Sequence, residues 1–117
     1  MSAFLPRQLV SGLFAPGHLT YRLDRSENST EPTLTDMATK AVEVLRSNPN
    51  GFLLVVESGL IDVAHHRGNA ARALHETILL SDTVQAVDGL LNPSETLIIG
   101  WNINILLATN HDDLFLC

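Results

Sequence analysis

The chain has 117 residues, a length that fits one domain with one hydrophobic core. Hydrophobic residues make up 45% of it and charged residues 17%, a balance that argues against a largely disordered chain. The formal net charge is −6 and the seven lysine and arginine residues are scattered, which argues against nucleic acid as a partner.

Residues 1–32 are expected to form an irregular lead-in, because Pro6, Pro16, Pro32 and two glycines interrupt them. The first ten residues lack the basic start and continuous apolar stretch of a secretory signal. No segment approaches the ~20 apolar residues of a membrane span. The residues themselves therefore show no signal or anchor, and the single cysteine, Cys117, allows no internal disulfide.

A helix is predicted to begin at Thr33. Thr33 and Asp36 have the spacing of a capping box, with aspartate in the place usually taken by glutamate. The following apolar residues recur at helical spacing: Leu34, Met37, Ala38, Ala41 and Leu45. Asn48-Pro49-Asn50-Gly51 is expected to end this helix, since proline cannot continue it and Asn-Gly readily adopts positive φ.

Two strands and a second helix are predicted downstream. The continuous apolar run 52–56 is typical of a strand buried on both faces of a parallel sheet, and 96–99 has the same character. Between them a helical pattern runs from about residue 69 to 91, with Glu76 assigned to its solvated face. The order helix, strand, helix, strand over 33–99 predicts an α/β fold with a partial parallel sheet.

This predicted sheet is incomplete. Two parallel strands leave both edges without partners, and both faces of such a sheet need cover that two helices only partly supply. The chain is therefore expected to be one partial domain, a piece of a larger fold or a unit that folds only with other material.

Acidic and imidazole side chains follow the first predicted strand. Glu57 ends that strand, and Asp62 and His66 lie four residues apart, so a helical turn places them on one face. A carboxylate and an imidazole together suit zinc, whereas Glu57 without imidazole neighbours suits magnesium. The alternative is a plain helix start, with Asp62 near the positive end of the dipole and His66 exposed.

Residues 51–68 carry a resemblance: G-F-L-L-V-V-E-S-G-L-I-D-V-A-H-H-R-G resembles the segment G-F-F-L-x-V-E-G-G-x-I-D-x-G-H-H-x-G of alkaline phosphatases. Residues 12–18 are similar to that family's G-L-F-x-P, and 31–37 to its E-P-S-L-x-x-M. The likeness covers roughly residues 11–99 in order.

The resemblance implies a hydrolase of phosphate monoesters with two zinc ions, one magnesium ion and a transiently phosphorylated serine. Its fold would be part of a three-layer α/β/α sandwich, and the parent would be a homodimer, extracellular or membrane-anchored. Glu57 would be the magnesium ligand, and Asp62 and His66 would be ligands of the first zinc. A family calcium site would involve Phe14 and Glu31, but Ala15 stands where its glutamate is usual.

Several parts of the family's site have no counterpart in this sequence, including the Asp-Ser nucleophile pair, the phosphate-clamping arginine and the last zinc histidine. No catalytic residue is therefore assigned. Residues 100–117 form a divergent tail, where Gly100-Trp101-Asn102-Ile103-Asn104 replaces the T-A-D-H-S-H that binds the second zinc. His111 offers a faint echo of that motif. The expectation is a fragment that is inactive alone; the alternative is a non-catalytic metal-binding or partner-binding relative.

Overall fold

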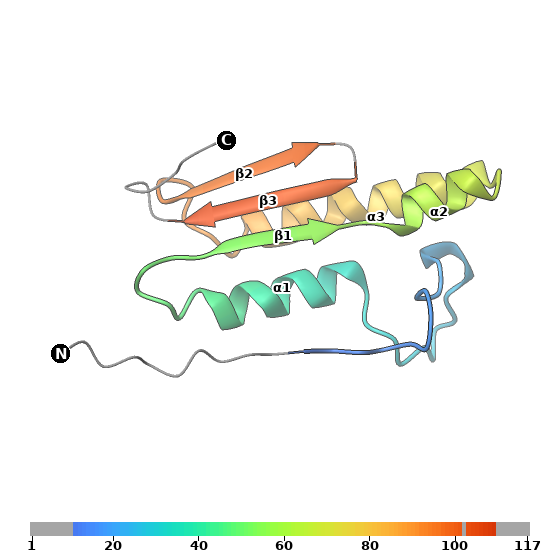
Figure 1. Ribbon diagram of the computed structural model, residues 1–117, viewed down its shortest axis with the longest axis horizontal. Helices are drawn as coiled ribbons and strands as arrows, with labels where there is room; N and C mark the ends of the chain where they lie inside the picture. The colour runs from blue at the N-terminus through green and yellow to red at the C-terminus, as the bar shows by residue number, and fades with distance from the viewer. Residues whose placement is uncertain (1–10, 102, 110–117) are drawn as a thin grey trace.

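The computed structural model describes residues 11–101 and 103–109, and Figure 1 shows its helices packed beside a small sheet. The elements in chain order are the 3-10 helix η1 (Arg22–Asp24), α1 (Leu34–Leu45), β1 (Leu53–Glu57), α2 (Leu60–His66), α3 (Ala70–Asp88), β2 (Thr96–Trp101) and β3 (Asn104–Thr109). The predicted α/β class is confirmed. The helices and strands predicted between residues 33 and 99 are all present, and α2 precedes the long helix as a separate short one.

Helix α1 begins where the sequence predicts. The Thr33 hydroxyl accepts a hydrogen bond from the Asp36 backbone N–H at 3.0 Å, and the Asp36 carboxylate accepts one from the Thr33 N–H at 2.8 Å. This capping box satisfies two donors that the helix itself cannot. Val42 lies on the buried face of the helix with no exposed surface. The turn that follows contains Gly51 with a φ of 77°, as expected for the residue after asparagine.

We expect Thr33→Ala to lower the free energy of unfolding by about 1 kcal/mol at neutral pH, because the Asp36 N–H loses its hydroxyl acceptor and the Asp36 carboxylate loses the hydrogen bond that this hydroxyl donates at 2.7 Å. Hydrogen bonds from the Thr33 hydroxyl and then from its N–H hold the pKa of Asp36 below its ordinary value of 3.8. That contribution is present above 3.8 and is lost as the pH falls through the lowered pKa, so the difference between variant and wild type should shrink in acid. Denaturant melts at several pH values measure this difference in the free energy of unfolding.

The control is Thr77→Ala, at an exposed position inside α3, which should lower the free energy of unfolding little. An equal loss of stability at both sites would contradict the assignment of Thr33 as the capping residue of α1.

The sheet is antiparallel, which corrects the predicted parallel pairing. Its strand order is β1-β3-β2, and β3 pairs antiparallel with both neighbours. Strands β1 and β2 consequently run in the same direction, as predicted, but they are not paired with each other. The physical reason lies in the tail: residues 104–109 turn back after β2 and occupy the position between the two strands (Figure 1).

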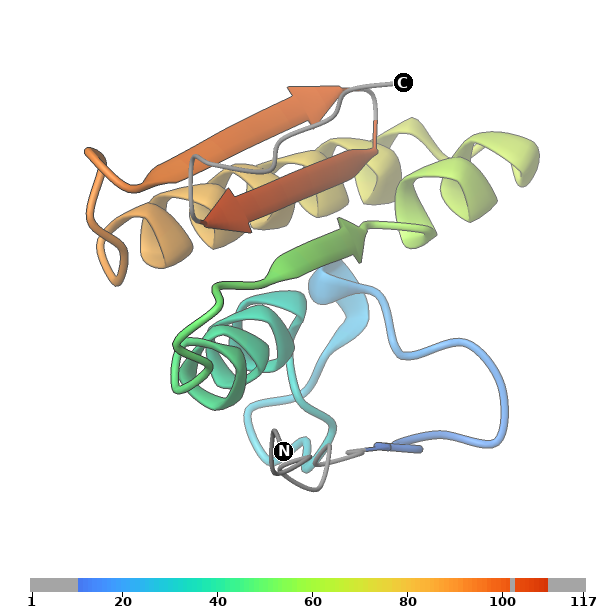
Figure 2. The ribbon, with the colours of Figure 1, turned by 60° about the vertical axis from the view of Figure 1, so that its left-hand side comes forward.

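Only one face of the sheet is buried by helices, so the prediction of strands buried on both faces is also wrong. Val56, Ile105 and Leu107 point into a core shared with α1 and α3, and Figure 2 shows α3 running behind the sheet. Leu53 and Val55, at alternate positions of β1, are exposed.

The described part of the lead-in, residues 11–32, contains η1 as its regular structure and is otherwise irregular, as predicted. Ion pairs tie it to α3: Arg22 contacts Asp82 at 2.7 Å, and Asp24 contacts Arg72 at 2.7 Å. The Arg72 guanidinium also lies 4.9 Å from the centre of the Tyr21 ring. The lead-in therefore packs on α3, and Tyr21 also belongs to a small buried cluster with Ala64 of α2 and Ala73 of α3.

Candidate metal centre

Helix α2 places two of the three predicted metal ligands. Ile61 and Ala64 are buried and anchor the helix, which turns Asp62 and His66 outward. The Asp62 Oδ2 and His66 Nε2 atoms are 3.4 Å apart, and the two side chains are 59% and 80% exposed. Residues four apart on a helix share a face, so the predicted pairing of this carboxylate and imidazole is present.

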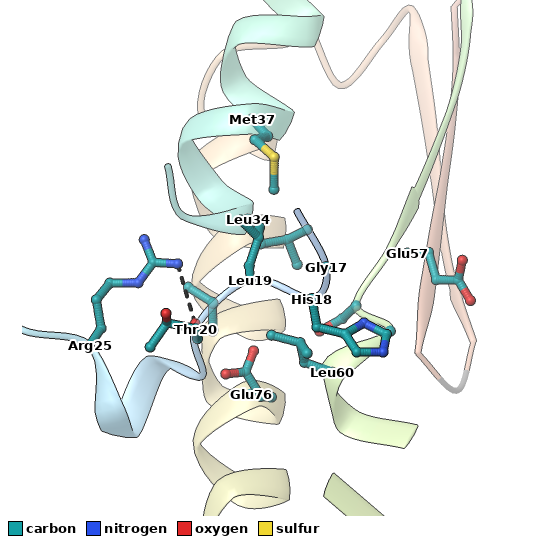
Figure 3. Close-up of a pocket in the computed structure, with 13 residues that line it drawn as sticks. Gly17, His18, Leu19, Thr20, Arg25, Leu34, Met37, Glu57, Leu60 and Glu76 are labelled. Atoms are coloured by element: carbon teal, nitrogen blue, oxygen red, sulfur yellow. Dashed lines mark hydrogen bonds between the residues drawn. The ribbon is translucent and has the colours of Figure 1, made fainter. Parts of the chain in front are cut away.

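The third predicted ligand, Glu57, lies at the end of β1. Its neighbour Val56 is buried under the helices, and Glu57, by the alternation of the strand, is exposed on the other side. Figure 3 shows the Glu57 carboxylate directed away from Leu60 and Glu76. Within residues 11–101 and 103–109, no group of three or more histidine, cysteine, aspartate or glutamate side chains is arranged to hold one metal ion. Asp62 and His66 are thus brought together, and Glu57 stays apart from them.

A pocket of about 410 Å³ opens beside the Ser58-Gly59 turn that joins β1 to α2 (Figure 3). Apolar side chains from the lead-in and three helices form much of its wall: Leu19, Leu34, Met37, Leu60 and Leu79. Ser58 is 3% exposed, and among the described residues its hydroxyl has no hydrogen-bond partner. Polar side chains complete the lining, among them His18, Arg25 and Glu76.

Glu76 also lines this pocket, and its assignment to a solvated face is wrong. The residue is 2% exposed, and its Oε1 accepts a hydrogen bond from the Arg22 backbone N–H at 2.6 Å. The reason is the lead-in, which covers this part of α3. The sequence carried a usable signal, since Glu76 lies on the same helical stripe as the buried Ala73 and Leu80.

At the position of the family's calcium site, near Phe14 and Glu31, the Glu31 carboxylate already has protein partners. Glu31 Oε2 accepts a hydrogen bond from the Thr20 N–H at 2.8 Å, and Arg25 lies 4.0 Å from the same oxygen. The Thr20 hydrogen bond is the main cause of the lowered pKa of Glu31, to which the positive charge of Arg25 adds. Phe14 is exposed.

The faint zinc-ligand motif at His111 cannot be compared with the structure, because His111 lies outside the described residues.

Comparison with known proteins identifies the family. The sequence profile described as "Alkaline phosphatase" matches residues 5–101, which is most of the chain. The chain belongs to the alkaline phosphatase family. It is 46% identical over 86 residues to the tissue-nonspecific alkaline phosphatase of Gallus gallus, covering 74% of this chain and 16% of that relative.

Other alkaline phosphatases give similar matches. The tissue-nonspecific isozyme of Homo sapiens is 42% identical over 88 residues, covering 75% of this chain and 17% of the relative. The membrane-bound alkaline phosphatase of Bombyx mori is 43% identical over 94 residues, covering 80% and 17%. This member of the family therefore spans less than a fifth of the length of each of these relatives. No solved structure was found to match it.

The match confirms the family membership that the sequence resemblance predicts. The matched range contains Glu57, Asp62 and His66, and it ends at residue 101, where β2 also ends. Strand β3 lies beyond it. None of the helices in the described residues has the length and hydropathy that crossing a membrane requires.

Proposed function

We propose that this chain supplies the central metal-binding segment of an alkaline-phosphatase-type hydrolase. Asp62 and His66 would hold zinc, and Glu57 would hold magnesium. The observation that carries the proposal is the 3.4 Å approach of Asp62 Oδ2 and His66 Nε2 on an exposed helix face, in a chain of this family. Glu57, exposed at the end of a strand, has the oxygen chemistry that magnesium prefers.

The donor set fits zinc in part. A carboxylate oxygen and an imidazole nitrogen are ordinary zinc ligands, but a tetrahedral ion takes four. The described residues bring two of them together, so the remaining positions would be filled by water or by residues of the parent protein. Such an ion would activate a water molecule and stabilise negative charge on oxygen. This chain would hold the ion through Asp62 and His66, and no catalytic residue is assigned to it.

The parent reaction would be hydrolysis of phosphate monoesters. Its relatives carry the name alkaline phosphatase, but the chain covers only 16–17% of the lengths of the relatives described above. Zinc binding without turnover is therefore the behaviour expected of the chain alone. For the parent, we propose a homodimer at an extracellular or membrane-anchored location; a relative from Bombyx mori is named as membrane-bound.

Replacing both zinc ligands, Asp62→Ala with His66→Ala, should abolish zinc uptake and leave the helix content nearly unchanged, since both side chains are mostly exposed. Titration calorimetry with zinc measures the first effect and circular dichroism the second. The matched control is His65→Ala with Asp88→Ala, which removes one exposed histidine and one exposed aspartate elsewhere. Equal zinc uptake by the two double variants would contradict the ligand assignment.

A non-catalytic relative that acts by association is the second candidate. The observation that favours it is the open face of the sheet, where Leu53, Val55 and Trp101 are exposed. Zinc binding does not separate the two candidates. Phosphate monoester hydrolysis with zinc and magnesium, measured after the missing segments are supplied as a second chain, does: turnover supports the hydrolase, and its absence from a complex that forms supports the second candidate.

A further inference from the structure

The central strand of the sheet comes from the part of the chain that the alkaline phosphatase match does not include. The match ends at residue 101, and β3 runs from Asn104 to Thr109. Both of its neighbours, β1 and β2, lie inside the matched range. The family-like part of the chain thus contributes two strands that run in the same direction with a gap one strand wide between them.

This gap, which we call the β1–β2 slot, is lined by backbone groups on both sides. Strand β3 pairs with β1 from Leu53↔Ala108 to Glu57↔Asn104 and with β2 from Thr96↔Thr109 to Trp101↔Asn104. The pairing continues past the ends of β1: the Ser58 N–H donates to the Ile103 carbonyl at 2.8 Å, and the Thr109 N–H donates to the Phe52 carbonyl at 3.1 Å. Without β3, both strands would present unpaired N–H and C=O groups to the slot.

The core beneath the slot is apolar and selects the side chains of its occupant. Ile105 and Leu107 of β3, the present occupant, are 2% and 0% exposed and belong to the core that α1 and α3 share with the sheet. The alternate residue Leu106 faces away from that core and is partly exposed. An occupant that replaces β3 in the same register must therefore be extended and carry branched apolar side chains two residues apart, and β3 itself runs antiparallel to both neighbours.

We propose that the β1–β2 slot is a strand-binding site. In this chain its own β3 fills the slot, and the β3 segment of a second copy can bind there in its place. The short connection between Trp101 and Asn104 gives the internal β3 an effective concentration in the millimolar range. At ordinary protein concentrations the slot therefore binds the internal β3 in preference to the β3 of a second copy. Exchange between copies then requires that the sheet open first, as on refolding at high concentration. This inference does not depend on metal binding, and neither outcome of the zinc experiment affects it.

Capture of a β3 peptide tests the slot directly. The full chain carrying Ile105→Asp and Leu107→Asp cannot seat its own β3, because two carboxylates would enter the apolar core. A fluorescent peptide with the natural sequence of residues 103–110 should bind this variant at least tenfold more tightly than it binds the wild-type chain, as read by anisotropy. A peptide with aspartate at both positions serves as the control and should bind neither chain.

Disulfide trapping between whole chains covers the case in which that variant does not fold. In a Cys117→Ser background, chains with Val55→Cys are co-refolded at high concentration with chains carrying Leu106→Cys, the residue paired with Val55. Leu53→Cys with Leu106→Cys is the off-register control, since such diagonal positions lie ~7–8 Å apart, beyond disulfide reach. Peptide capture or a preferential on-register interchain crosslink supports the proposal. It is overturned if the natural peptide binds no better than the aspartate peptide and the two cysteine pairs crosslink equally or not at all.

Discussion

Leu107→Ala is expected to lower the free energy of unfolding by about 2–5 kcal/mol, the usual cost of removing a buried leucine side chain. Leu107 has no exposed surface and packs in the core with Val42, Val56 and Leu80, so the change removes contacts with a strand and with both long helices. The free energy of unfolding of domains of this size is roughly 5–15 kcal/mol, so the substitution should remove a large share of it. Denaturant melts of the full chain measure the difference.

Leu53→Ala is the matched control for that prediction. Leu53 is also a strand leucine, but it is 64% exposed on the open face of the sheet, and its truncation should cost less than about 1 kcal/mol. Equal costs at the two positions would mean that residues 104–109 do not form a central strand. The comparison therefore tests the main structural difference between the predicted and the observed sheet.

Features set by a few neighbouring residues could be predicted from the sequence. The capping box at Thr33 and Asp36 and the positive φ of Gly51 depend on contacts within three or four residues. The pairing of Asp62 with His66 is equally local, because the geometry of one helical turn determines it. Local patterns therefore predicted the helix starts, the main turn and the approach of Asp62 to His66.

The pairing of the strands could not be predicted in the same way. A continuous apolar run does not say how many of its faces are covered, and β1 is covered on one. The run Ile103–Ala108 carried the missing signal, since five of its six residues are apolar and it follows closely on β2. A run of this kind indicates a strand but does not indicate which strands it pairs with. Long-range pairing then decided the fold of the sheet.

The site shows the same division between local and distant contacts. Asp62 and His66 meet within one helix, whereas any further ligand must come from another segment, and residues 11–101 and 103–109 place none beside them. The pocket next to α2 is assembled from the lead-in, β1 and three helices, so no sequence window contains it. The helical stripe of Glu76 indicates its burial, but the hydrogen-bond partner of its carboxylate, the Arg22 N–H, comes from the lead-in and is distant in sequence.

Glu76→Ala is expected to lower the free energy of unfolding by about 1–3 kcal/mol, because the Arg22 N–H loses its acceptor in a partly buried place. The lead-in should also detach more readily from α3, so trypsin should cut faster after Arg22 and Arg25. Glu76→Gln keeps an oxygen that can accept the hydrogen bond and should stay close to wild type in both measurements. This pair of variants separates the acceptor role of the side chain from its charge.

The control for Glu76→Ala is Glu27→Ala, the same change at an exposed position of the lead-in, which should alter neither stability nor cleavage appreciably. Faster cleavage in Glu76→Ala with unchanged global stability would place the effect in the lead-in alone. If Glu76→Ala is cleaved no faster than Glu27→Ala, the lead-in is held by the Arg22–Asp82 and Asp24–Arg72 ion pairs, and the buried hydrogen bond is dispensable. Exposed ion pairs of this kind contribute little individually, which is why the buried acceptor is expected to dominate.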